Sequence, residues 1–268
     1  MTALQAKRLD TVGMLVSLLT LGLAIAWAFP ICWSLFATAT PAPGASLLSV
    51  LENYRQVIFE TSLGRWYINS IVTSGGVTLI VLAISSACGY AISQINFTGR
   101  TVLWFMILAS FMIPVQALIV NHFFLIYQLG LLNTWLGVIL PQLIAPISVI
   151  VYKGFFDNVP DEYREAAQID GARHWQIFLG IYLPMNWGIT VALGIIVFIG
   201  AWNAFLWPFL AVTKPELMNV TVGATESWSG EVSELITAVM VALPVAVLYL
   251  LFQRKVTEAI SFSTGIKG

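Results

Sequence analysis

The sequence predicts an all-α, polytopic membrane protein with six transmembrane helices, and residues 1–268 are expected to form a single transmembrane domain. Three observations lead to this fold class. The chain is 59% hydrophobic and only 9% charged, whereas soluble domains carry about 25% charged residues. Its charges are clustered and separated by long apolar stretches, and its Lys and Arg residues gather in alternate loops. This composition excludes a cytosolic enzyme, a disordered chain and a nucleic-acid-binding protein.

Stretches that lack Asp, Glu, Lys and Arg mark the expected spans. About 20 apolar residues suffice to cross a ~30 Å hydrocarbon layer. The stretch 101–152 has room for two spans, with a turn indicated at its middle by Gly130 and Asn133. The first apolar run exceeds the 7–15 residues of a signal peptide core, so we expect a retained span. The predicted spans lie near 12–36, 68–93, 102–127, 135–155, 187–212 and 235–253.

The distribution of Lys and Arg predicts the orientation. With a cytoplasmic N-terminus, nine of the basic residues lie inside and three lie outside. Cytoplasmic loops of membrane proteins carry such an excess, so both termini are expected in the cytoplasm. The inner residues are Lys7, Arg8, Arg100, Lys153, Arg164, Arg173, Arg254, Lys255 and Lys267, and the outer ones are Arg55, Arg65 and Lys214.

Several kinds of chemistry have no signal in the sequence. The apolar stretches lack the carboxylates that ion-coupled transporters generally use. Neither a phosphate-binding loop nor an HExxH helix is present, and Cys32 and Cys88 lie in apolar runs without metal-ligand spacing. We therefore expect no catalytic residue, no metal and no directly bound cofactor, so any energy for transport must come from a partner.

One inner loop, residues 157–185, carries a motif. Pro160, Asp161 and Glu162 suit the start of a helix, and Gly171 is suited to end it in a left-handed conformation. A second short helix is expected to present one apolar face, made of Trp175, Phe178, Leu179 and Tyr182. Ala166 and Ala167 are expected to form a small-residue face that another protein can approach closely, with Glu165 beside it. The alternative interpretation is an amphipathic hairpin that merely lies at the membrane surface.

This loop resembles the EAA loop of the permease subunits of ABC importers. The match comprises Glu165, Ala166, Ala167 and Gly171, then Ile181, Leu183 and Pro184 at the family's spacing. Similarity to one branch, the carbohydrate permeases of the maltose-transporter second-subunit type, extends over most of the chain. It includes Asn69-Ser70, the segment 129–134 and Trp202-Asn203. Where that branch commonly has a second proline after the one corresponding to Pro114, this chain has Asn121, which leaves the solute open.

The resemblance implies a function, a location and partners. It implies a non-catalytic permease in the bacterial cytoplasmic membrane that imports sugars or related polyols. The loop would form coupling helices that dock on an ATPase, with Glu165, Ala166, Ala167, Asp170, Gly171, Leu183 and Pro184 as the coupling residues. The expected partners are a second homologous permease, two ATPase subunits that bind ATP and Mg, an extracytoplasmic solute-binding protein, and membrane lipid.

Polar and aromatic side chains within the spans are candidates for the solute pathway. Amides bind hydroxyl groups and aromatic rings stack on sugars, although the same groups also hold transmembrane helices together. Asn203 and Trp207 are expected to share a helical face, because they are four residues apart. The six candidates are Gln116, Asn121, His122, Trp202, Asn203 and Trp207.

Two other classes of function remain open. An ATP-independent channel or facilitator is compatible with the same spans, and so is a scaffold that anchors other proteins. Neither class needs a coupling surface, so an intact EAA loop favours the importer.

Overall fold

The computed structural model describes residues 11–41, 44, 46–59, 61–226 and 231–263. Within these residues every regular element is a helix, which confirms the predicted all-α class. In this part of the chain three helices are long and apolar enough to cross a membrane singly, and three bent helix pairs bring the candidate spans to as many as six. The chain divides into two compact units.

The first unit contains residues 1–61 and 227–242. Helix α1 covers Thr11–Ala39 and α2 covers Leu47–Phe59. Helix α14, Glu231–Ser263, begins in this unit and continues into the second. The Tyr54 hydroxyl donates a hydrogen bond to Thr38 Oγ1 at 2.9 Å, which ties α2 to the end of α1. By their bounds, the continuous helices α1 and α14 correspond to the predicted spans 12–36 and 235–253.

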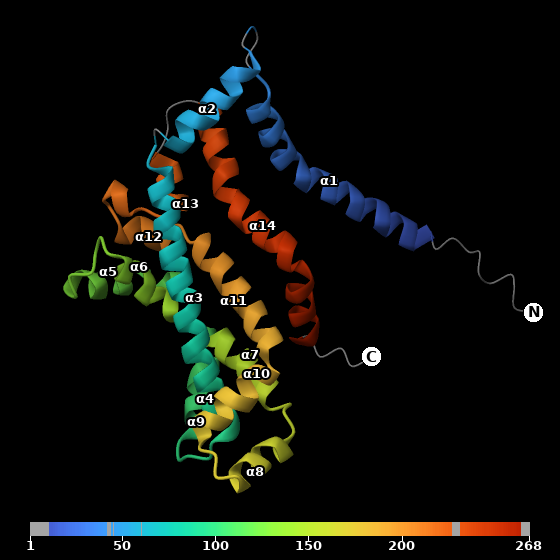
Figure 1. Ribbon diagram of the computed structural model, residues 1–268, viewed down its shortest axis with the longest axis vertical. Helices are drawn as coiled ribbons and strands as arrows, with labels where there is room; N and C mark the ends of the chain where they lie inside the picture. The colour runs from blue at the N-terminus through green and yellow to red at the C-terminus, as the bar shows by residue number, and fades with distance from the viewer. Residues whose placement is uncertain (1–10, 42–43, 45, 60, 227–230, 264–268) are drawn as a thin grey trace, which may run out of the picture. The chain divides into compact units, whose positions relative to one another are not determined.

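The second unit, residues 62–226 and 243–268, is built around α3, Leu63–Gln94 (Figure 1). This helix packs against α7, Pro146–Phe156, and α11, Trp187–Trp202. At Gly89 a side chain would have no room, because a Cβ atom there would lie 2.8 Å from Tyr152 Cβ and 3.0 Å from the Lys153 nitrogen. Small residues at such crossings let transmembrane helices approach closely.

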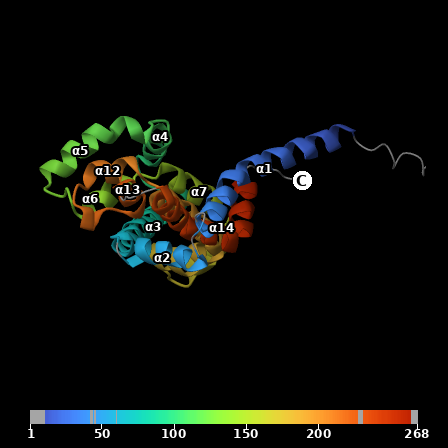
Figure 2. The same ribbon diagram turned by 90° about the horizontal axis from the view of Figure 1, so that it is seen from above.

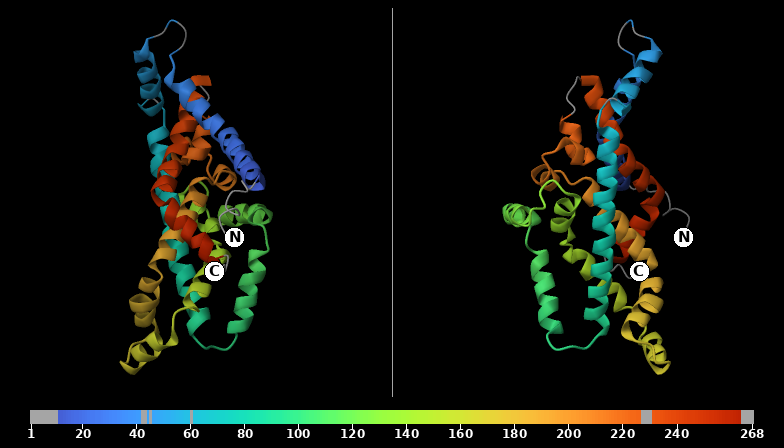
Figure 3. Two further views of the ribbon diagram at one scale, coloured as in Figure 1. Left: turned by 90° about the vertical axis from the view of Figure 1, so that its right-hand side faces the viewer. Right: turned by 60° about the vertical axis from the view of Figure 1, so that its left-hand side comes forward.

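The other candidate spans are broken. Helix α4, Arg100–Phe111, meets the segment Val115–Gln128 at 92°, so that α5, Ile119–Gln128, lies across it (Figure 3). The segment Trp135–Leu143, which contains α6, Trp135–Ile139, and the 3₁₀ turn η2, Leu140–Leu143, meets α7 at 52°. His174–Met185 meets α11 at 80°. The segment of the predicted span 187–212 is not one continuous helix, because α11 ends at Trp202.

The segment 212–226, called the return segment here, contributes side chains that stabilise the break after α11. The Ala204 carbonyl accepts hydrogen bonds from Asn219 Nδ2 at 3.0 Å and Thr221 Oγ1 at 2.9 Å. Backbone groups in a membrane need such partners wherever a helix is interrupted. Beyond the break, α12, Leu206–Ala211, packs against α5 and α6 (Figure 2). The turn η4, Pro215–Leu217, and helix α13, Val220–Glu226, follow.

Two asparagines fasten this return segment to the rest of the unit. Asn133, at φ 57°, accepts hydrogen bonds at its Oδ1 from the backbone nitrogens of Thr213 and Lys214. The buried Asn69 donates to the carbonyls of Glu216 and Met218 and accepts from Trp135 Nε1.

Trp66 and Trp135 lie near the ends of predicted spans, and tryptophan at such positions is expected at the membrane interface. Trp66 is instead buried and donates from Nε1 to the Pro215 carbonyl at 2.8 Å, so that expectation is wrong for it.

Candidate functional site

The loop predicted over 157–185 folds as two helical segments separated by a glycine turn. Helix α8 covers Asp161–Ile169, and α9, His174–Ile177, continues through the π-helical turn η3, Phe178–Tyr182, into α10, Leu183–Met185. Pro160 stands one residue before α8, and Gly171 has φ +78° as expected. The Gly171 nitrogen bonds to the Gln168 carbonyl and the Ala172 nitrogen to the Ala167 carbonyl. This pair of bonds is a Schellman motif, which fixes the path of the chain between the helices.

Helix α8 lies beyond the end of α3 (Figure 1). Its outer side, meaning the side that faces away from α3, has no partner within the described chain. Glu165, Ala166 and Asp170 are exposed, and Ile169 is 86% exposed. Ala167 is half-buried and packs on the apolar cluster between α3, α7 and η3. The expected face of two alanines is therefore wrong, because successive residues of a helix point about 100° apart.

The second half of the loop presents a different apolar side from the predicted one. Trp175 and Leu179 are exposed, whereas Ile177 and Tyr182 are buried. The π-helical turn explains the difference, because its wider i→i+5 turn places residues five apart on one side. Of the remaining coupling candidates, Leu183 packs on the apolar cluster and Pro184 is exposed.

A polar network, missed by sequence interpretation, joins this loop to α3. Gln94, the last residue of α3, accepts at Oε1 from Arg164 Nη1 and from the Tyr182 hydroxyl, both at 2.8 Å. Its Nε2 donates to Ser93 Oγ at 2.7 Å and to the Phe156 carbonyl at 3.1 Å. A lone glutamine at a helix end carries no sequence signal, since its partners on the other elements lie 62 to 88 residues away along the chain.

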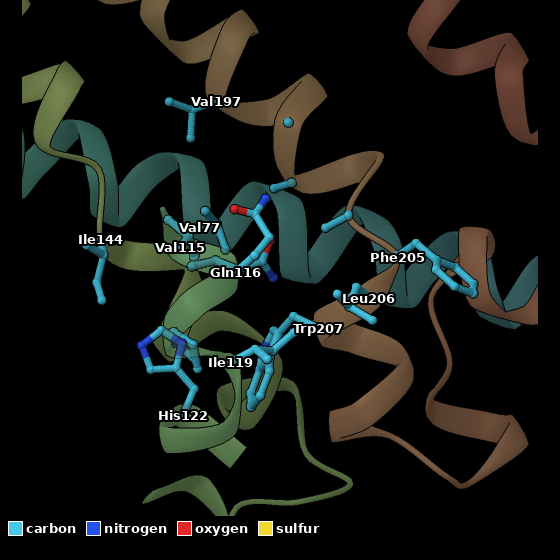
Figure 4. Close-up of a pocket in the computed structure, with 15 residues that line it drawn as sticks. Val77, Val115, Gln116, Ile119, His122, Ile144, Val197, Phe205, Leu206 and Trp207 are labelled. Carbon is cyan, nitrogen blue, oxygen red and sulfur yellow. The ribbon is translucent and has the colours of Figure 1, made fainter. Parts of the chain in front are cut away.

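A pocket of about 490 Å³ lies where the helix breaks after α4, before α7 and after α11 come together. Gln116 and His122 line it from the segment after α4, Gln142 from the turn before α7, and Trp207 from α12. Figure 4 shows Gln116 in the middle of this space, with His122 and Trp207 on one side of it. Irregular backbone at membrane depth is found where it lines a cavity or is buried in protein.

Two aromatic groups stand in fixed positions in the pocket wall. The His122 and Trp207 rings meet edge to face, with centroids 6.1 Å apart. Trp207 Nε1 donates to the carbonyls of Gly137 and Val138, both at 3.2 Å, so the indole is held against α6. None of the residues that line the pocket is Asp, Glu, Lys or Arg. The pocket therefore offers amide, imidazole and indole groups in an otherwise apolar wall.

The structure brings three of the six pathway candidates together: Gln116, His122 and Trp207. Asn121 is exposed and does not line the pocket, because it is the helical neighbour of His122 and points away. Trp202 is buried against Phe198 and Tyr67. Asn203 caps α11 and is exposed, so the expectation that it shares a helical face with Trp207 is wrong. Sequence interpretation missed Gln142, since the break that exposes it has only Pro141 and Pro146 as signals.

The part of the chain with assigned positions contains no group of three or more His, Cys, Asp or Glu side chains suited to a metal ion. The fold and the pocket define a polytopic, all-α membrane protein whose broken helices surround an uncharged cavity.

The comparisons identify the family. Residues 80–257 match the model of the binding-protein-dependent transport system inner membrane component, and the chain belongs to this family. An arabinooligosaccharide transport system permease protein of Halalkalibacterium halodurans is 31% identical, with 81% of this chain and 80% of that protein covered. A diacetylchitobiose uptake system permease protein of Streptomyces coelicolor is also 31% identical, with 80% and 73% covered.

The fold has a solved counterpart. A bacterial ABC transporter involved in the import of the acidic polysaccharide alginate contains a chain that superposes with a TM-score of 0.80 at 20% identity. The match covers 92% of this chain and 97% of that one. The likeness shows a shared fold.

Proposed function

We propose that the chain is one of two homologous permease subunits of an ATP-driven importer for a sugar or related polyol. Two ATPase subunits bind ATP and Mg and hydrolyse the nucleotide, and an extracytoplasmic binding protein delivers the solute. Membership of the family supports the importer, and the names of the two permease relatives support a carbohydrate.

The observation that carries the proposal is the exposed side of α8. A solvent-exposed isoleucine at 86% and the acidic side chains of Glu165 and Asp170 stand on a loop whose course is fixed by Gly171. An apolar residue in a charged rim is typical of a protein–protein contact. A channel has no need of a rigid surface of this kind, whereas an ATPase needs one to move the spans.

The pocket supports the solute class. A neutral, hydroxylated solute suits amides and an indole in an apolar wall, because such a pocket combines few hydrogen-bonding groups with a surface for stacking. A charged solute would lack a counter-charge among the lining residues. The partner permease completes the enclosure.

The test uses the complete transporter reconstituted in liposomes, with Glu165→Lys and Gly171→Val in this subunit. Reversing the charge at the docking surface weakens ATPase binding. A β-branched residue at φ +78° costs ~1–3 kcal/mol of backbone strain and displaces the loop. We expect normal membrane insertion, reduced co-purification of the ATPase and loss of ATP-dependent uptake in both variants.

Gly154→Ala is the matched control for the glycine variant. A side chain at Gly154 meets nothing within 4 Å, so uptake should stay at the wild-type level. Wild-type ATPase recovery and uptake in both loop variants would contradict the coupling role. Uptake by this chain alone, without ATP or partners, would favour the facilitator instead.

A further inference from the structure

We propose that Gln94 is a positioning residue that passes the movement of the coupling loop to α3 and α7. The proposal rests on the proposed function, and it adds the point at which the loop is fastened to the spans. Gln94 ends α3, while its partners lie on α8, on η3 and at the end of α7.

The amide of Gln94 is used to its full capacity. A glutamine side chain has two acceptor positions and two donor hydrogens. Both acceptor positions are taken by Arg164 and Tyr182, and the two donors go to Ser93 and the Phe156 carbonyl. No other side chain of similar length offers two donors and two acceptors at once, so each substitution loses at least part of the set.

The two sides of α8 make different contacts, because one side bonds to Gln94 and the other is exposed. Arg164 turns inward to Gln94 and is also paired with Asp161 at 2.9 Å, while the adjacent Glu165 is exposed. A protein docked on the outer side therefore pushes on a helix whose inner side is hydrogen-bonded to α3. Ala167 gives the same side of α8 an apolar contact with the cluster around Tyr182.

The partners of Gln94 are rigid. Tyr182 and Phe156 are fully buried, at 0% exposure, and their rings meet edge to face. Ser93 Oγ donates to Asp157 Oδ1 at 2.6 Å, which adds a second bond between α3 and the end of α7. Networks of this kind are worth more together than their single bonds suggest. Displacement of α8 therefore carries α3 and α7 with it instead of being absorbed by side-chain rotation.

The experiment measures solute imported per ATP hydrolysed by the reconstituted transporter carrying Gln94→Met, Gln94→Glu or Tyr182→Phe. Gln94→Met keeps the side-chain length and removes all four bonds. Gln94→Glu keeps the acceptors for Arg164 and Tyr182 but loses the donors. Tyr182→Phe removes one bond and keeps the buried ring. Asn96→Ala is the matched control, because this exposed amide nearby bonds only to Arg100 in the structure.

We expect Gln94→Met to lower the import per ATP by ~10-fold or more, because all four hydrogen bonds of the amide are lost, while ATP hydrolysis and ATPase recovery stay near wild type. Gln94→Glu should fall between Gln94→Met and wild type, Tyr182→Phe should show a smaller loss, and Asn96→Ala should show none. A purely structural role would instead lower thermal stability and reduce import and hydrolysis in parallel, leaving their ratio unchanged.

An unchanged ratio in Gln94→Met and Tyr182→Phe overturns the positioning role. If Glu165→Lys still weakens ATPase binding in that case, the proposed function stands without the positioning role of Gln94. If Glu165→Lys also leaves the ATPase bound and active in uptake, the proposed function itself fails.

Discussion

At the scale of single residues, Gly89 sets how closely α3 and α7 approach. A methyl group there meets Tyr152 Cβ at 2.8 Å and the Lys153 backbone. We predict that Gly89→Ala separates the helices and destabilises the protein by about 1–3 kcal/mol, the usual cost of overpacking. Thermal unfolding of the purified protein in detergent measures the effect.

Gly75→Ala provides the comparison for this prediction. Gly75 lies in the same helix, and a methyl group there would have no neighbour within 4 Å. The substitution should therefore leave the melting temperature unchanged or raise it slightly, because alanine favours the helix more than glycine does. Equal melting temperatures for the two variants would mean that the close approach at Gly89 is not maintained in the folded protein.

The structural role of some residues can be predicted from the sequence, and that of others cannot. Gly171 was predictable, because a glycine after a run of helix formers indicates a left-handed cap. Asn69 and Gln94 were not predictable as junctions, since their partners lie far along the chain and an amide does not indicate its partner. Trp66 was misassigned because a tryptophan near a span end satisfies an interfacial role and a buried one equally well.

At the scale of elements, the broken helices determine which side chains line the pocket. His122 stands on α5 only because the chain turns by 92° after α4. We predict that His122→Gln keeps solute affinity, whereas His122→Leu raises the KM for uptake by ~5–10-fold through the loss of one hydrogen-bonding group. Uptake by reconstituted transporter, normalised to folded protein, gives the comparison.

Melting temperatures of the same preparations decide between solute binding and helix packing. Gln128→Ala, an exposed position on the same helix outside the pocket, should change neither quantity. If His122→Leu lowers stability while its normalised uptake stays at the wild-type level, the imidazole holds helices together and does not meet solute.

Sequence interpretation located apolar segments along the chain but not the breaks within them. Hydrophobicity reports that a segment prefers lipid, and it is nearly the same for a straight helix and for two bent ones. Pro114 and Pro146 signal two of the bends, yet the end of α11 at Trp202 has no proline beside it and depends on Asn219 and Thr221 for its stability. Asn203 and Trp207 were therefore assigned to one face.

At the scale of the whole molecule, the distribution of Lys and Arg predicts that both termini lie in the cytoplasm. We predict that a membrane-impermeant thiol reagent added outside intact cells labels Glu216→Cys and leaves Glu165→Cys unmodified, in a background with Cys32 and Cys88 replaced by serine. Both side chains are exposed on this chain. In cells that lack the ATPase subunits nothing docks on Glu165, so accessibility differs only through the membrane. Labelling of Glu165→Cys from outside would reverse the topology, and permeabilised cells supply the control for reactivity.

The three breaks around the pocket also have a mechanical consequence. A continuous helix is stiff because each turn is bonded to the next, so a bundle flexes where that ladder is interrupted. In this chain the interruptions after α4, before α7 and after α11 all border one cavity. Flexure at any of them moves part of the cavity wall. Bending of the bundle at these breaks therefore changes the shape of the cavity.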